Sequence, residues 1–445
     1  MPHQPLLLRR LGLGSATALV ISNMIGTGIF TTTGFLAGDL GQPWLILLIW
    51  IVGAIAALLG AICYAELAAN FQRSGGEYVY LSHAYGPIWG FITGWVSLLA
   101  GFSAPIAAAA LSFASYVAVF FPRWGRFDQQ MTACLLVASC SLANLFGIHR
   151  AARLQNALTV LKLTLLIVFT LAGLLFGHGD WHHFSQTATR STNTPILQQF
   201  AVSLFWIYLA YSGWNAAAYV AEEVKHPERT LGRALIFGTG LVALLYLLLN
   251  VTFFYATPPE AMKGVMAVGA RAAAYLFGPR IAGAFSLLMA CGLLSTVNAM
   301  TIAGPRVYYA MARDGQFFRF AETVHRRWRT PFNAILIQAF CTTLLVFTPF
   351  PQLVVYIGFT LNFFAVMSVA SLFIFRRQPQ WHCSEIVSFA YPLIPCLFMA
   401  IGIWMTIEGV LQQPLISVLV TFTLASGGIL YWLRSKNTER PIIEA

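Results

Sequence analysis

The chain has 445 residues, of which 58% are hydrophobic and only 9% are charged, and its mean hydropathy is +0.72. Soluble domains carry about 25% charged residues, so the composition excludes an ordinary soluble enzyme, a disordered chain and a nucleic-acid-binding protein. The net charge of +11 fits the basic cytoplasmic loops of a membrane protein better than an acidic partner. Seven scattered cysteines without a CxxC pair argue against a disulfide framework and a zinc site.

Uncharged runs long enough to cross a bilayer recur along the whole chain, since a crossing helix needs about 20 mostly apolar residues. We predict twelve spans in one transmembrane domain covering residues 1–445, and no nucleic-acid partner. The spans are 14–36, 44–65, 88–121, 130–148, 163–177, 196–221, 234–257, 281–305, 331–348, 352–375, 386–407 and 412–433. They divide into a first group of five (14–177), a second group of five (196–375) and a final pair (386–433).

The distribution of basic residues predicts the orientation. If both termini are cytoplasmic, the inside loops and tails hold eighteen Lys and Arg residues and the outside loops hold six. This bias follows the positive-inside rule. The first apolar run is long and no small-residue cleavage site follows it, so we expect no cleaved signal peptide.

Two spans contain glycine-rich interruptions near their midpoints. The first span reads Gly26-Thr27-Gly28, and the sixth reads Tyr211-Ser212-Gly213. Corresponding interruptions in two halves of a transporter mark its binding site, because unwound turns free N–H groups for a carboxylate and C=O groups for an ammonium. Gly-x-Gly in a single span more often serves close helix packing, but interruptions at matching places in two spans favour a site for a zwitterionic amino acid. Their offset of five spans predicts inverted repeats.

Lys162 lies within the fifth span, where a charged residue is a functional hypothesis by default. Its alternative role is a long side chain that reaches back to the cytoplasmic interface. A buried lysine could carry a coupling proton, and a permanently charged one could take the place of a coupling sodium ion. The sequence leaves both possibilities open.

Acidic residues end two spans on the cytoplasmic side. Glu66 ends the second span, and Glu222 and Glu223 end the sixth. They are either a solvated rim or a gate of ion pairs with Arg73, Arg229 or Arg313. We expect Arg306, near the cytoplasmic end of the eighth span, to anchor its helix or to join that gate rather than to bind substrate.

No residue pattern in the spans indicates an enzyme, a metal centre or a bound cofactor. Catalytic Ser–His–Asp and HExxH arrangements do not occur within them. The loop cluster His178, Asp180, His182 and His183 is a weak metal candidate. Gly75-Gly76 lacks the following Lys-Ser/Thr of a phosphate-binding loop.

Several motifs together resemble those of amino acid permeases in the amino acid–polyamine–organocation superfamily, most closely the L-type amino acid transporter branch. The motifs are Gly26-Thr27-Gly28-Ile29-Phe30, Tyr64-Ala65-Glu66-Leu67, Gly75-Gly76-Glu77-Tyr78-Val79-Tyr80-Leu81, Tyr85-Gly86-Pro87, Ala210-Tyr211-Ser212-Gly213-Trp214-Asn215, the segment 222–230 and the segment 306–315. This resemblance implies an all-α integral membrane fold, with a LeuT-type five-plus-five inverted repeat, discontinuous first and sixth helices and two extra C-terminal helices.

The resemblance also implies roles for single residues. The backbone at Thr27 and Gly28 would hold the substrate carboxylate, and the carbonyls of Met24, Leu209 and Ser212 would hold its amino group. The remaining residues expected at the site are Ile25, Gly26, Ala210, Tyr211, Gly213 and Asn215, with Ser295 and Thr296 from the eighth span. Lys162 matches the fifth-helix lysine that replaces a sodium site in sodium-independent members.

Departures from the family pattern carry further expectations. Leu209 stands where relatives have a large aromatic gate, so another side chain is expected to occlude the substrate. The loop 122–129 contains no cysteine, which removes the disulfide to an ancillary subunit and favours a stand-alone protein of the bacterial inner membrane. No acidic residue lies within the first, third, sixth and eighth spans, and this favours neutral substrates.

The sequence therefore predicts a sodium-independent secondary transporter of neutral L-amino acids that works by alternating access, as an exchanger or a proton symporter. A carrier of cationic amino acids or polyamines remains an alternative. So does a sensor that binds an amino acid without moving it.

Overall fold

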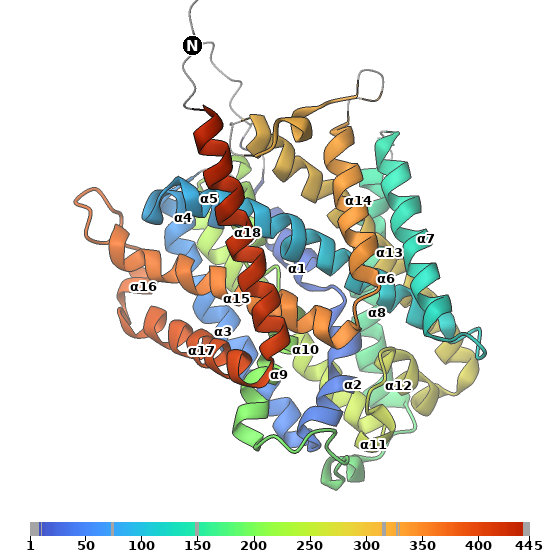
Figure 1. Cartoon of the computed structure of the whole chain (residues 1–445). Helices are drawn as coiled ribbons and strands as arrows, with labels where there is room; N and C mark the ends of the chain where they lie inside the picture. The colour runs from blue at the N-terminus through green and yellow to red at the C-terminus, as the bar shows by residue number, and fades with distance from the viewer. Residues whose placement is uncertain are drawn as a thin grey trace, which may run out of the picture.

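The computed structural model describes residues 9, 11–72, 75–146, 151–313, 317–325, 328 and 330–438, and within these ranges every regular element is a helix. The helices form one bundle, in which α1 lies near the centre and α18 runs along the outside (Figure 1). Arg73 and several other loop arginines that entered the predicted orientation lie outside the described residues: Arg10, Arg150, Arg326, Arg327, Arg329 and Arg440.

The first part of the chain builds five predicted spans from broken and continuous helices. Its elements are α1 (Leu13–Met24), α2 (Gly28–Leu40), α3 (Pro43–Asn70), α4 (Glu77–Tyr85), α5 (Pro87–Val96), the π-helix η1 (Ser97–Ser103), α6 (Ala104–Ala118), α7 (Arg126–Leu145) and α8 (Ala151–Phe176). Prolines open α3 and α5, as expected where the first N–H of a helix needs no partner.

The second part repeats this use of broken and continuous helices. Its elements are η2 (Trp181–Ser185), α9 (Ile196–Tyr211), the 3-10 helix η3 (Ala216–Glu223), α10 (Pro227–Ala256), α11 (Pro259–Met262), α12 (Val268–Phe277), α13 (Pro279–Arg313), η4 (Arg319–Glu322), α14 (Phe332–Val346) and α15 (Phe350–Phe375). The chain ends with α16 (Glu385–Ser388), α17 (Leu393–Gln412) and α18 (Pro414–Thr438).

Seven of the described helices are long and apolar enough to cross a membrane, and the bent pair α1 and α2 makes an eighth candidate. The other four predicted spans contain the helices α7, α8, α9 and α14. The twelve-span count and the five-plus-five repeat therefore stay predictions. The eleventh span begins later than its predicted start at 386, because α17 starts at Leu393, directly after a proline.

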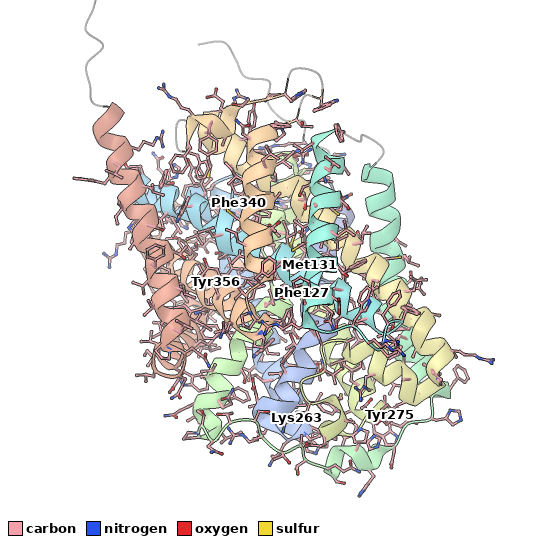
Figure 2. All side chains as sticks on the ribbon, turned by 45° about the vertical axis from the view of Figure 1, so that its right-hand side comes forward. Phe127, Met131, Lys263, Tyr275, Phe340 and Tyr356 are labelled. Atoms are coloured by element: carbon pink, nitrogen blue, oxygen red, sulfur yellow. The ribbon has the colours of Figure 1, made fainter. Side chains whose placement is uncertain are left out.

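Large apolar side chains cover the outside of the bundle. Phe127 on α7 and Phe340 on α14 are 66% and 64% exposed, and both point away from the helices that carry them (Figure 2). Phe422 on α18 is 70% exposed. Soluble proteins rarely expose apolar surface on this scale, so these side chains indicate contact with lipid.

The interior is built around α10, which packs along both α3 and α1. The helix α13 packs against α6, and α9 packs against α2 and α15. This arrangement places the ends of α1, α2 and α9 inside the bundle rather than at its lipid-facing surface.

Candidate functional site

The first span is broken at the glycine-rich motif. α1 ends at Met24, α2 begins at Gly28, and the two helices are bent by 41°. Ile25 has a non-helical ψ of 84°, and its neighbour Gly26 donates an N–H to the Met24 carbonyl at 2.8 Å. Met24 and Ile25 are each 1% exposed, so the break lies in the core.

The sixth span is broken at the second motif. α9 ends at Tyr211, and Ser212 takes an extended conformation with ψ of 145°. Gly213 has a φ of +95°, which a residue with a side chain adopts only under strain. The chain then continues through a turn into η3, so that regular α-helix does not resume before α10.

The two breaks lie against each other. A Cβ added to Gly28 would meet the Cα of Ala210 at 2.2 Å, and one added to Gly213 would meet the backbone carbon of Asn23 at 2.8 Å. The glycines therefore let two unwound backbones come into direct contact. This contact is the geometry expected of a site made of peptide groups rather than of side chains.

The N-terminus of α2 presents N–H groups at this contact. The first N–H groups of a helix have no partner within it, and they carry its positive dipole end. The Phe30 N–H instead donates to the Thr27 carbonyl at 3.1 Å, and the Thr31 hydroxyl donates to the same oxygen. That the backbone at Thr27 and Gly28 holds the substrate carboxylate stays a prediction.

Two side chains from distant helices bind the carbonyls that α1 leaves open. The Tyr246 hydroxyl on α10 donates to the Met24 carbonyl at 2.7 Å, and the Lys162 ammonium on α8 donates to the Ile25 carbonyl. Lys162 is 4% exposed, and its stem packs against Gly292 on α13. The lysine thus reaches inward to the break and does not extend to the interface.

The carbonyls predicted to hold an ammonium already accept hydrogen bonds. The Met24 carbonyl accepts hydrogen bonds from the Gly26 N–H and the Tyr246 hydroxyl. The Leu209 carbonyl accepts from the Ser212 N–H at 3.1 Å and from the Ser212 hydroxyl at 2.7 Å. A carbonyl oxygen has two lone pairs. A substrate ammonium at either position must share or displace these donors.

The predicted residues of the eighth span lie on α13, next to the lysine. Thr296 donates its hydroxyl to the Gly292 carbonyl at 3.2 Å, one turn earlier, where the Lys162 stem packs. Ser295 is 1% exposed, and its hydroxyl has no partner among the described residues. An unpartnered buried hydroxyl is costly, so Ser295 is a site for a further polar contact.

Asn215 has a hydrogen-bond partner outside the predicted site. Its amide donates to Oε1 of Glu77 at 3.1 Å, and the Tyr64 hydroxyl donates to the same oxygen at 2.7 Å. Glu77 begins α4, outside the membrane-spanning helices, and burial raises its pKa to about 7. The structure thus attaches a buried carboxyl to the segment that follows the second break.

Comparison with known proteins shows the family of the chain. Residues 11–430 match the family described as amino acid permease. The chain belongs to the amino acid permease family. It is an L-type-like member of the amino acid–polyamine–organocation superfamily.

Individual relatives match this permease along almost its whole length. It is 29% identical to the mouse large neutral amino acids transporter small subunit 2 over 96% of this chain and 81% of the relative. It is 28% identical to the human b(0,+)-type amino acid transporter 1, covering 97% and 88% of the two chains. The mouse Asc-type amino acid transporter 1 is 27% identical, covering 96% and 81%.

The partner of Glu66 in the permease was not predicted. Glu66 is 0% exposed, and both of its oxygens bind Arg376, which follows α15, at 2.8 and 2.6 Å. Arg73, Arg229 and Arg313 were the predicted partners, and the prediction missed Arg376, which gives Glu66 a bidentate ion pair. Two further donors complete the contact, Trp381 Nε1 at 2.9 Å and the Ser384 N–H at 3.1 Å.

The other gate candidates have contacts of different kinds. Arg306 donates to the Ile302 carbonyl one turn earlier, as an anchoring residue would. The Glu223 carbonyl accepts the N–H of Leu11 at 2.9 Å, which ties the start of the first span to the end of η3. Glu222 is the neighbouring residue at the end of η3.

The helix of the first span extends beyond its predicted end at residue 36. α2 continues to Leu40 and includes an acidic residue, Asp39, in its last turn. Asp39 accepts the Ser203 hydroxyl of α9 at 3.1 Å. It lies eleven residues beyond Gly28, roughly 16 Å along the helix, and so far from the break.

Sequence reasoning did not find Tyr246 or Glu77. Tyr246 carries a polar group within an otherwise apolar span, and such a hydroxyl needs a partner when buried. Glu77 belongs to the motif of residues 75–81, from which no role for its carboxyl was predicted. The loop histidines have structural contacts instead, since His178 and His183 each bind backbone carbonyls through Nδ1.

Proposed function

We propose that the protein is a secondary transporter of neutral L-amino acids that works by alternating access, independently of sodium, as an exchanger or a proton symporter. It acts as a multi-pass protein of the bacterial inner membrane with both termini in the cytoplasm. The observation that carries the proposal is the contact of the two helix breaks, Gly28 against Ala210 and Gly213 against Asn23.

The substrate is held mainly by peptide groups. Its carboxylate binds the free N–H groups at the start of α2, where the helix dipole favours an anion. Its ammonium binds carbonyls of the two breaks, and shares or replaces the donors already present there. Every α-amino acid carries both charges, so the side chain is recognised separately.

Lys162 supports sodium independence. Its ammonium donates a hydrogen bond to the Ile25 carbonyl at the first break, from a helix distant in sequence. A sodium ion needs several oxygen ligands, and a fixed ammonium at the same carbonyl competes with it. The lysine thereby supplies the positive charge that a bound ion would otherwise bring.

The charge of the site supports neutral substrates. Asp39 lies at the far end of α2 and is bound by Ser203. Glu77, however, contacts Asn215 directly, which keeps a carrier of cationic amino acids as the second candidate. An arginine or polyamine substrate would need such a carboxylate to remain charged.

Partner independence is also part of the proposal. The mouse and human relatives include proteins named as small subunits, so these act in a larger assembly. Here the connection from α6 to α7 contains no cysteine, and the described cysteines are all free. We therefore propose that no disulfide-linked subunit joins this chain and that it functions without one.

Counterflow in proteoliposomes tests the proposal. Vesicles with the purified protein are loaded with unlabelled amino acid and exposed to labelled alanine, serine, leucine or arginine. We expect uptake of the neutral compounds and equal rates when sodium is replaced by choline. Preferred uptake of arginine would support the cationic carrier, and binding without any flux would support the sensor.

A further inference from the structure

The Gly75-Gly76 turn after α3 places an acidic residue inside the protein. Gly75 and Gly76 have φ values of +128° and +52°, and a Cβ on Gly76 would lie 2.9 Å from Cε1 of Tyr219 on η3. The turn thus lets α4 begin directly against η3. Its first residue, Glu77, is only 8% exposed.

Glu77 joins three elements that belong to different parts of the chain. Tyr64 comes from α3, and Asn215 follows the break of the sixth span. Trp214, next to Asn215, packs edge-on against the Tyr64 ring, with the centroids 4.7 Å apart. Through these hydrogen bonds, the Glu77 carboxyl connects α4 and α3 to the segment between α9 and η3.

Among the described residues, the side chains that surround Glu77 are polar and uncharged. The titratable groups coupled to it are the phenols of Tyr64, Tyr80, Tyr208 and Tyr219, from α3, α4, α9 and η3. The described ion pairs do not include Glu77. Arg73 and Ser74, just before the turn, lie outside the described residues.

The other ionisable groups on these elements have separate positions. Glu66 on α3 is paired with Arg376, and His83 on α4 binds the Val79 carbonyl. Glu222 and Glu223 end η3, whereas α5, α9 and α15 contain no Asp, Glu, Lys or Arg within their bounds.

We propose that Glu77 is a proton-binding site, and that loss of its proton accompanies the separation of α4 from the segment after the second helix break when the permease opens to the cytoplasm. The proposal rests on the proposed function, since it assumes alternating access. Tyr219 is 39% exposed and its ring covers Gly76, so the cluster lies directly beneath the surface of the protein.

The burial of Glu77 determines which form of the permease, closed or open, binds the proton more tightly. In the closed arrangement burial raises the pKa of Glu77 from 4.5 to about 7, while the bonds from Tyr64 and Asn215 act in the opposite direction. Exposure to water would return the pKa toward its ordinary value. The closed form therefore binds the proton more tightly, and each pH unit between these two values changes the closed-to-open ratio by up to about tenfold.

Infrared difference titration of the purified full-length protein tests proton binding without any substrate. We expect a protonated-carboxyl band that disappears with a midpoint near pH 7 and is absent in Glu77→Gln. Tyr64→Phe removes a donor to the charged form and should move the midpoint to higher pH. Glu228→Gln, at an exposed cytoplasmic glutamate, should leave the band unchanged.

Transport then tests the linkage. In proteoliposomes at internal pH 6 to 8, about the range set by the raised pKa, we expect the wild type to vary in exchange rate and Glu77→Gln to vary less than twofold. A band that persists in Glu77→Gln, or a midpoint unmoved in Tyr64→Phe, overturns the proton site. If Glu77→Gln loses the band but its exchange rate varies with pH as in the wild type, the link between this proton and opening is overturned. Absence of uptake by the wild type would instead contradict the proposed function and leave the infrared result standing.

Discussion

At the scale of single residues, the site depends on groups that bind peptide oxygens. Lys162 and Tyr246 come from two different helices and bind consecutive carbonyls, those of Ile25 and Met24. A buried carbonyl without a donor is unfavourable, so these two side chains stabilise the unwound turn itself. They hold the break at which we propose that the substrate binds.

Replacing Lys162 by methionine tests this role. Methionine keeps most of the stem volume against Gly292 but removes the ammonium. A hydrogen bond from a charged group contributes about 1.5–3 kcal/mol, so we expect counterflow to fall about tenfold or more. Lys225→Met, at an exposed lysine, is the matched control. Unchanged flux in Lys162→Met would show that the ammonium is not required.

At the scale of elements, two helix ends meet because Gly28 has no side chain and Ala210 has only a methyl group. Gly28 starts α2 against Ala210 on α9, and no side chain fits between the two backbones. The same close approach gives α2 and α9 a shared surface, which the hydrogen bond from Ser203 to Asp39 extends toward the outer side. These two outer half-helices therefore form one packed unit.

Gly28→Ala should separate that unit. The added methyl would lie 2.2 Å from a backbone atom, so one helix must move, and overpacking of this kind costs about 1–3 kcal/mol. We expect a lower midpoint of thermal unfolding and a loss of substrate counterflow. Gly240→Ala on α10, where nothing lies within 4 Å, is the control and should behave as wild type. Normal transport by Gly28→Ala would contradict the close contact.

The sequence predicted the helix breaks better than their partners. Gly-x-Gly in an apolar span is a local signal: α1 ends at Met24, just before the predicted motif, and α2 begins at Gly28, within it. The ion pair of Glu66 with Arg376 joins residues 310 positions apart, and the bond of Asn215 to Glu77 joins residues 138 apart. Such pairs arise from packing, which a single sequence does not display. The predicted partners of Glu66 were chosen by membrane side alone, and that criterion does not distinguish one arginine from another.

At the scale of the whole molecule, the two breaks separate an outer unit from an inner one. α2 and α9 form the outer unit, and α1 and η3 form the inner unit, because Leu11 and Val224 make an isolated β-bridge. Leu11 donates to the Glu223 carbonyl at 2.9 Å and accepts from Lys225 at 2.8 Å. Both halves of the inner unit are thus tied together at this bridge, so we expect them to move together when the permease changes conformation.

Leu11→Pro and Leu11→Ala together test this coupling. Proline removes the N–H that donates to Glu223, whereas alanine keeps both backbone bonds and shortens only the side chain. One hydrogen bond contributes about 1 kcal/mol, so we expect the proline variant to exchange substrate about fivefold more slowly than the alanine variant. The concentration giving half-maximal counterflow should stay nearly the same in both, because the substrate binds at the breaks and not at this bridge. Equal rates in the two variants would mean that α1 and η3 move independently, and a rate difference matched by an equal loss of affinity would place the effect at the binding site instead.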